Sequence, residues 1–106
     1  MQKVIHKVIL IMKKEIEKII VEWDDNKNRN NFRKHGIHFE TAALVFADAD
    51  RIEYYDKVHS VDEDRFIVVG CVHGVLCSVY TMRGEVIRLI SARVANSIER
   101  RIYYGE

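Results

Sequence analysis

The stretch YTMRGEVIRLISAR, residues 80–93, predicts a β-hairpin. Two runs rich in β-branched and large apolar residues flank Arg83-Gly84, a turn pair in which glycine tolerates positive φ. The second run carries Arg88, Ser91 and Arg93 among apolar neighbours, and cations on an apolar strand are costly unless they are paired or face water. Two explanations stay open for these cations: salt bridges to the many carboxylates of the chain, or an anionic ligand such as phosphate or RNA on the sheet surface.

Turn length also predicts which side chains share a face of the sheet, because two-residue turns fix the strand register. We expect His73-Gly74 to be the turn before residues 75–82. One face should then carry Arg65, Ile67, Val69, Cys71, Leu76, Ser78, Tyr80, Ile87, Leu89, Ser91 and Arg93. The opposite face should carry Phe66, Val68, Gly70, Cys77, Val79, Thr81, Val86, Arg88, Ile90 and Ala92. This register separates Cys71 from Cys77 and argues against a disulfide between them.

Length and charge restrict the class of protein. The chain has 106 residues and a formal net charge of +1, which favours one domain without a global basic signature. Nucleic-acid binding therefore has to come from a local cluster of cations. The apolar run at residues 8–12 is far shorter than the roughly 20 residues that cross a bilayer, and no signal-peptide cleavage site follows it. We expect a cytoplasmic protein with no membrane association.

The order of periodic segments predicts an α+β fold. Residues 1–18 form an N-terminal extension in which apolar spacing favours a helix, although the β-branched content favours a strand. Residues 19–106 form one domain, with Asp24 as the N-cap of its first helix and Gly36 at that helix's C-terminus. The expected elements are a strand at 19–23, helices at 25–34 and about 39–46, strands at 51–58, 65–72, 75–82 and 85–93, and a closing helix at 95–104 that buries Ile98 and Ile102.

Several short motifs occur in one order along residues 20–104. They are Val21-Glu22-Trp23-Asp24, Asn31, Lys34-His35-Gly36-Ile37, Phe39-Glu40, Ala43 with Phe46 and Asp48, Arg65, Thr81 with Arg83-Gly84, Arg88-Leu89-Ile90-Ser91-Ala92-Arg93-Val94-Ala95, and Glu99-Arg100 with Tyr103. In this order and spacing they resemble the BrnT family, the toxin half of a bacterial type II toxin–antitoxin system. The chain departs from the family at His38, where a Ser or Thr helix cap would be expected, and at Asp25, where proline is common.

The resemblance implies a RelE-like ribonuclease fold, with two N-terminal helices packed on a four- to five-stranded antiparallel sheet and a C-terminal helix. It implies an endoribonuclease that cleaves RNA and arrests growth. It also implies a cognate BrnA-like antitoxin that covers the toxin and binds operator DNA, so that DNA is contacted only through the antitoxin. A homodimer and a 2:2 heterotetramer are the assemblies that we consider.

Metal-independent RNA cleavage needs a base for the 2′-OH, cations for the phosphate and an acid for the leaving 5′ oxygen. Histidine is the natural acid or base near neutral pH, and arginine is the natural phosphate clamp. On the positions that carry the resemblance, the candidate catalytic residues are His35 with Lys34, the clamp residues Arg65, Arg83 and Arg93, and the hydroxyl residues Thr81 and Ser91. Tyr80, which can stack a base, and Arg88 are the candidate RNA-binding residues.

Each candidate has a structural alternative. His35 can be a surface residue at a helix end, Arg88 can pair with an acidic strand, and His59 and His73 read as loop residues. Two other functions compete with the ribonuclease: a RelE-like binding module that has lost catalysis, and a structural metal protein that uses Cys71, Cys77 and histidines. The cysteine spacing completes no four-ligand zinc set, so we expect no metal and no cofactor.

Overall fold

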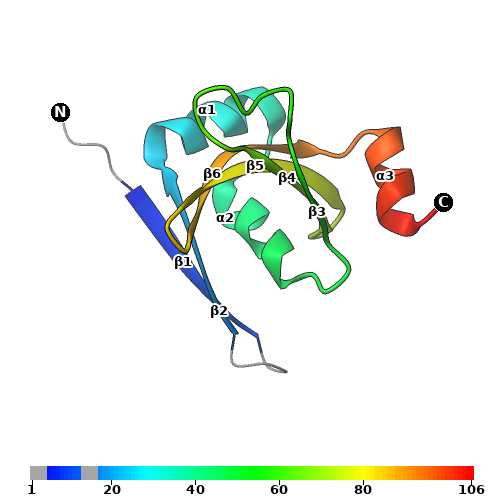
Figure 1. The fold of residues 1–106 in the computed structure, drawn as a ribbon, viewed down its shortest axis with the longest axis horizontal. Coiled ribbons are helices and arrows are strands. Elements are labelled where there is room, and N and C mark those ends of the chain that lie inside the picture. The colour runs from blue at the N-terminus through cyan, green and yellow to red at the C-terminus, as the bar shows by residue number, and fades with distance from the viewer. Residues whose placement is uncertain (1–4, 13–16) are drawn as a thin grey trace.

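A twisted β-sheet organises the chain (Figure 1). The structure is a computed structural model that describes residues 5–12 and 17–106. Over these residues the sheet has six strands in the order β1-β2-β6-β5-β4-β3. The strands are β1 (Ile5–Met12), β2 (Glu17–Asp24), β3 (Ile52–Tyr55), β4 (Phe66–Cys71), β5 (Val75–Arg83) and β6 (Val86–Val94). Neighbouring strands are antiparallel except β2 and β6, which pair in parallel at Val21–Ile87 and Glu22–Arg88.

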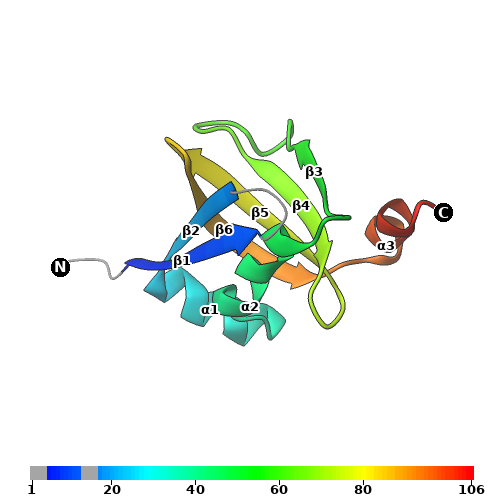
Figure 2. The ribbon, with the colours of Figure 1, turned by 90° about the horizontal axis from the view of Figure 1, so that it is seen from below.

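Helical segments cover one face of the sheet (Figure 2). They are α1 (Asp25–His35) and α2 (Phe39–Ala42), which continues into the 3-10 helix η1 (Ala43–Ala47). Phe39 and Phe46 are fully buried between these segments and the sheet, where they meet Trp23 and Tyr80 edge to face at centroid distances of 6.3 and 5.3 Å. The main core therefore lies between the α1–α2–η1 layer and this face of the sheet.

Helix α1 is held against the sheet by hydrogen bonds of asparagine side chains rather than by packing of an apolar stripe. Its buried residues are Asn28 and Asn31, whereas Phe32, its one large apolar residue, is exposed. The Asn31 side chain pairs with the edge of β6: its Nδ2 donates to the carbonyl of Ala92 at 2.8 Å, and its Oδ1 accepts from the Ala92 N–H at 3.0 Å. The helix is thereby held beside the half of β6 that β2 does not cover.

The helix ends follow the local chemistry of the sequence. Asp24 accepts a hydrogen bond from the Asn26 N–H, and Gly36 ends α1 at a φ of 73°, so both predicted caps of this helix are confirmed. His38 makes no side-chain cap, and the Oδ1 of Asn28 accepts from the Phe39 N–H at 2.8 Å instead. The departure at His38 is thus compensated by a residue of the preceding helix.

Three expectations about the elements are wrong. The helix predicted for residues 1–18 is replaced over Ile5–Met12 by a strand, which pairs with β2 and places Leu10 in the core. Its β-branched content outweighs its helical spacing once β2 is available as a partner. Residues 1–4 and 13–16 lie outside the described residues, and the division of the chain at residue 19 stays a prediction. The α+β class holds, but the second helix is only four residues long before η1, and the sheet is larger than four to five strands, with one parallel pair.

The predicted hairpin at residues 80–93 is present, but its turn lies one residue later. Arg83 pairs with Val86, so Gly84-Glu85 is the turn and Gly84 takes a φ of 63°. The turn between β4 and β5 has three residues rather than two, with His73 at a φ of 57°. A β-bulge between Val79 and Tyr80 shifts the pairing of β6 once more.

These register changes overturn part of the predicted sorting of faces. Arg65, Ser91 and Arg93 share the open face of the sheet, as predicted, but Tyr80 lies on the core face. Thr81 and Arg88, which we expected on the opposite face from Arg93, follow the alternation of Val79 and lie on its side. Cys71 and Cys77 also share one face, and both thiols are free.

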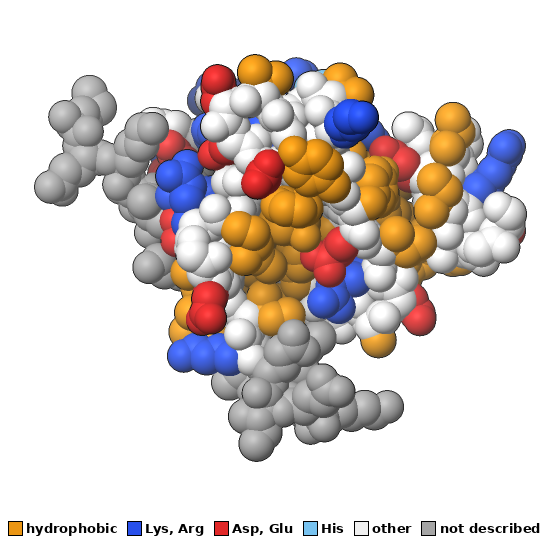
Figure 3. Space-filling model, viewed as in Figure 1, with side chains coloured by type: hydrophobic (Ala, Val, Ile, Leu, Met, Phe, Trp, Pro, Cys, Tyr) orange, Lys and Arg blue, Asp and Glu red, His pale blue; other side chains and the backbone are white. Residues whose placement is uncertain are grey.

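The closing helix α3 (Ser97–Tyr104) stands beside the end of the sheet (Figure 1). The prediction that Ile98 and Ile102 are buried is wrong, because they are 65% and 48% exposed. Glu99 and Tyr103 face the sheet instead, where the Tyr103 hydroxyl donates to Asp48 Oδ2 at 2.6 Å. Hydrophobic side chains consequently reach the surface around α3 (Figure 3). Among the described helices, none is long and apolar enough to cross a membrane.

Candidate active site on the open face of the sheet

A cavity of about 380 Å³ lies on the face of the sheet opposite the main core. Its floor is apolar and its rim is polar, and we call it the histidine cavity. It is lined by Asp56, Val58, His59, Arg65, Ile67, Cys77, Val79, Ile90, Ser91 and Arg93. The loop of residues 56–65, between β3 and β4, supplies the first rim, and the second half of β6 supplies the other. A small apolar floor with a few convergent polar groups is the usual form of a ligand site.

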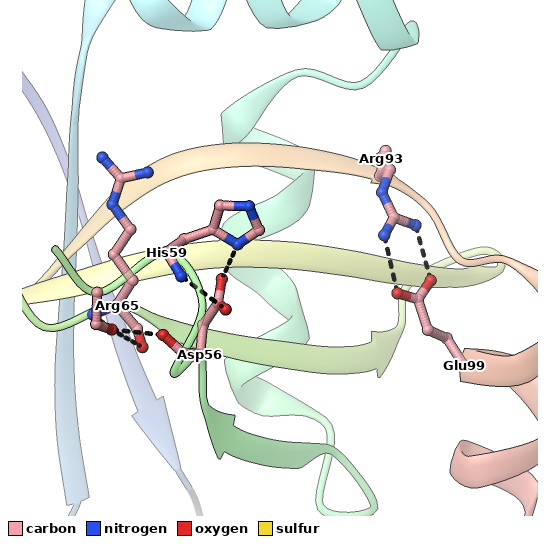
Figure 4. Close-up of polar contacts among 6 residues, drawn as sticks. Asp56, His59, Arg65, Arg93 and Glu99 are labelled. Atoms are coloured by element: carbon pink, nitrogen blue, oxygen red, sulfur yellow. Dashed lines mark hydrogen bonds and ion pairs between the residues drawn. The ribbon is translucent and has the colours of Figure 1, made fainter.

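Asp56 and His59 form a hydrogen-bonded pair on the loop rim (Figure 4). Asp56 is buried, and its Oδ2 lies 2.9 Å from His59 Nδ1, while its Oδ1 accepts from the His59 backbone N–H at 3.3 Å. A carboxylate accepts hydrogen bonds, so Nδ1 donates and Nε2 is the free acceptor of the neutral ring. The same carboxylate therefore fixes both the loop and the orientation of the imidazole.

The loop is closed against the start of β4 by backbone contacts of Arg65. The Asp56 N–H donates to the Arg65 carbonyl at 2.8 Å, and the Ser60 hydroxyl donates to the Asp56 carbonyl at 2.6 Å and accepts from the Arg65 N–H at 2.8 Å. The Thr81 hydroxyl holds the neighbouring carbonyl of Asp64 at 2.6 Å. These bonds fix the backbone from which both His59 and Arg65 project.

The guanidinium of Arg65 extends from this loop across the sheet (Figure 4). Over the part of the chain that the structure describes, it has no ion pair, and its buried Nε has no hydrogen-bond partner. A buried N–H without an acceptor is rare and costly. An anion in the cavity would satisfy it, because guanidinium groups bind phosphate oxygens through charge-assisted bonds.

Arg93 faces the cavity from β6 and is shared with α3. It makes two bonds to Glu99, at 2.7 and 2.8 Å to Oε1 and Oε2, while its own side chain stays 41% exposed. The bonds from Arg93 lower the pKa of Glu99 to about 2. Burial, together with Glu99, raises the pKa of the neighbouring Cys77 thiol to about 12, which disfavours the thiolate, the nucleophilic form of cysteine.

Beside the histidine cavity lies a smaller one, of about 240 Å³, against α1. We call it the lysine cavity, and it is lined by Lys27, Asn30, Asn31, Lys34, His35, Ile90 and Ser91. Ile90 and Ser91 line both cavities, so the two meet at the bulged part of β6. The structure thus brings Arg65, Ser91 and Arg93 into one cavity and puts Lys34 and His35 into the next.

The other predicted site residues lie outside both cavities. Tyr80 is buried in the core, stacked on Phe66, with its hydroxyl donated to Glu53 at 2.7 Å, and burial raises its pKa. Arg88 pairs with Glu22 at 2.6 Å, so the salt-bridge alternative for Arg88 is confirmed. Thr81 is buried beneath the loop, and Arg83 is exposed in the hairpin with Glu63 at 3.7 Å.

Sequence reasoning missed Asp56 and His59, which it assigned to a strand end and an exposed turn. The available signal was the spacing Asp56-x-x-His59-Ser60, since an aspartate that accepts from the backbone three residues on is a common turn-forming arrangement. Within the described residues, no group of three or more His, Cys, Asp or Glu side chains has the geometry of a metal site.

Comparisons with known proteins agree with the resemblance in the sequence. The family described as "Ribonuclease toxin, BrnT, of type II toxin-antitoxin system" matches residues 23–99. The crystal structure of the Brucella abortus ribonuclease toxin BrnT is similar in fold, with a TM-score of 0.56 and 21% sequence identity, and the match covers 71% of this chain and 94% of that one. A comparison with curated proteins finds no match.

Proposed function

This chain belongs to the BrnT family of ribonuclease toxins of type II toxin–antitoxin systems, and from this premise we propose that it is a metal-independent endoribonuclease whose active site is the histidine cavity. It cleaves RNA, arrests growth in the cytoplasm and is neutralised by a cognate BrnA-like protein antitoxin. The antitoxin, rather than the toxin, contacts operator DNA.

One observation carries this proposal: an imidazole fixed by a buried carboxylate lines the same cavity as Arg65, which has no ion pair among residues 5–12 and 17–106. His59 Nε2 is free to accept a proton, because Nδ1 is engaged by Asp56 at 2.9 Å. Arg65 and Arg93 line the same cavity and supply positive charge for the phosphate. A positioned base and a phosphate clamp are the main requirements of RNA cleavage without a metal.

The reaction that fits these groups is attack of the ribose 2′ oxygen on the adjacent phosphorus. His59 Nε2 accepts the proton of the 2′-OH as the new bond to phosphorus forms. The bond from phosphorus to the 5′ oxygen breaks, and the protonated imidazole returns the proton to that oxygen through solvent. Arg65 and Arg93 stabilise the charge on the phosphate oxygens, and the Ser91 hydroxyl lies within the same cavity to orient them. The products are a 2′,3′-cyclic phosphate and a 5′-hydroxyl.

Thr81 acts in this scheme as a positioning residue, because its hydroxyl holds the loop carbonyl next to Arg65. Tyr80 and Arg88 stabilise the fold through Glu53 and Glu22 and do not contact RNA. Arg83, exposed at the hairpin turn, is peripheral to the cleavage reaction.

The test is cleavage of a labelled single-stranded RNA by the purified protein in EDTA. His59→Gln should lower kcat by about 10²- to 10⁴-fold, the usual contribution of a positioned base. His73→Gln is the matched control, because His73 lies exposed in the turn between β4 and β5 and lines no part of the histidine cavity. An RNA with a 2′-deoxyribose at the scissile position should stay intact.

Two results would reject this mechanism. Cleavage by His59→Gln at the rate of the unchanged protein would remove His59 from the reaction, and a requirement for Mg²⁺ would remove metal independence. If the unchanged protein binds RNA but leaves it intact, the protein is instead a binding module on a toxin fold.

A further inference from the structure

The lysine cavity differs in charge from its surroundings. No carboxylate lines it, and among the described residues Lys27 and Lys34 have no ion pair. On another flank of α1, by contrast, a cavity of about 400 Å³ contains Arg29 and Arg33 together with the carboxylates of Asp25 and Glu40. The cations beside Ser91 are therefore available to a ligand without competition from a carboxylate in the same cavity.

The two lysines lie on one face of α1. Lys27 and Lys34 are seven residues apart, two turns of a helix, so they form a stripe about 10 Å long beside β6. The Asn31 amide between them is fully engaged with the backbone of Ala92 and Ile37. Asn31 therefore fixes the distance from the lysine stripe to the strand that carries Ser91 and Arg93.

The two cavities share Ile90 and Ser91 in their lining, so they are neighbours on either side of these residues. A phosphodiester strand carries one negative charge per nucleotide, so a phosphate bound between Arg65 and Arg93 has charged neighbours on either side. The strand that leaves the histidine cavity across Ser91 meets the lysine stripe next. Basic grooves that follow the backbone are the usual means of binding single-stranded nucleic acid without sequence preference.

We propose that the Lys27–Lys34 stripe of α1, with His35, is a second phosphate subsite that binds the single-stranded RNA next to the scissile phosphate. This inference rests on the proposed ribonuclease function and deepens it. It assigns Lys34 and His35 to substrate binding rather than to catalysis. Recognition is by charge, so the subsite favours longer RNA over a dinucleotide and has no preference among bases.

The experiment compares the variant Lys27→Gln/Lys34→Gln with the unchanged protein on two substrates. One is a 12-nucleotide RNA and the other is a dinucleotide with a single phosphate. The variant should have a raised KM for the 12-nucleotide RNA, with kcat and dinucleotide cleavage unchanged. The matched control is Lys18→Gln/Arg101→Gln, which removes two exposed cations from β2 and α3. It should cleave both substrates with the KM and kcat of the unchanged protein.

Salt dependence gives a second readout that does not require cleavage. Binding of a 12-nucleotide RNA blocked by 2′-O-methyl groups is measured by fluorescence anisotropy over a range of salt concentrations. Each phosphate contact on a single strand contributes about 0.7 to the slope of log K against log salt. Loss of two contacts should therefore reduce the magnitude of this slope by about 1.4. A weakened, less salt-dependent complex supports the subsite even if the unchanged protein proves not to cleave RNA.

Two outcomes would overturn the subsite while leaving the ribonuclease in place. In the first, the lysine variant keeps the KM and the salt slope of the unchanged protein. In the second, it loses dinucleotide cleavage as strongly as cleavage of the 12-nucleotide RNA, which would assign Lys34 to the chemistry itself.

Discussion

Glu99→Gln should remove a part of the folding stability that depends on pH. Arg93 lowers the pKa of Glu99 from 4.5 to about 2, and each pKa unit corresponds to about 1.4 kcal/mol. The full shift would amount to about 3 kcal/mol, but Arg93 is 41% exposed and solvent screens the pair, so we expect about 2 kcal/mol. Glutamine keeps an oxygen for the Asn96 N–H, from which Glu99 accepts at 2.8 Å, so the helix cap survives. The substitution removes the charge and, because an NH2 donor replaces Oε2, one of the two bonds from Arg93.

The sign of this effect follows from the direction of the pKa shift. A carboxyl whose folded pKa is lowered stabilises the protein above its unfolded pKa, and that stabilisation is lost as pH falls toward the folded value. Urea unfolding should therefore show a gap of about 2 kcal/mol between the two proteins at pH 7, which shrinks steadily between about pH 4.5 and 2. Glu85→Gln, in the exposed hairpin turn, should show no such gap. A gap of equal size at pH 7 and pH 2.5 would refute the reasoning.

Three further substitutions test contacts that support the site. Asn31→Leu should cost about 2 to 4 kcal/mol in urea unfolding, because it leaves buried backbone groups of Ala92 unpaired, and unaltered hydrogen exchange of the Ala92 amide would argue against this account. Arg88→Met should cost about 3 to 5 kcal/mol by leaving the Glu22 carboxylate buried alone, and Glu22→Met in the same chain should recover most of it; a double variant as unstable as the single one would exclude the ion pair as the cause. Thr81→Val should slow RNA cleavage by up to about 10²-fold through misplacement of the loop, and cleavage at an unchanged rate would contradict its positioning role.

Local chemistry in the sequence predicted a good part of the fold. The hairpin at residues 80–93, the cap at Asp24 and the stop at Gly36 depend on neighbouring residues, so short patterns predict them well. The clustering of Arg65, Ser91 and Arg93 was also predicted, because their common face survives the change of register. The order and spacing of the short motifs in residues 20–104 predicted the BrnT family, which the family match over residues 23–99 confirms.

The remaining features depend on contacts that a local pattern does not contain. A third residue in the turn at His73 and the bulge between Val79 and Tyr80 place Tyr80 and Cys77 on faces other than the predicted ones, since one residue more or less inverts the alternation of a strand. The hydrogen bond between Asp56 and His59 depends on the closed conformation of the loop of residues 56–65, which a local sequence pattern does not predict. The strand β1 needs β2 as its partner, so its helical spacing misled the prediction.

The contacts that hold β2 and α1 against β6 join distant parts of the chain and therefore slow its folding. The Glu22–Arg88 and Asn31–Ala92 bonds connect residues 66 and 61 positions apart. Such distant pairings must overcome the entropy of closing long loops, and domains dominated by them fold in roughly milliseconds to seconds. A newly synthesised chain therefore passes through an interval in which β6 is not docked and the lysine stripe and the arginines are still apart. Under the mechanism proposed above, the chain could not cleave RNA during that interval, because the groups of the histidine cavity would still be apart, and a cognate antitoxin could bind before the site forms.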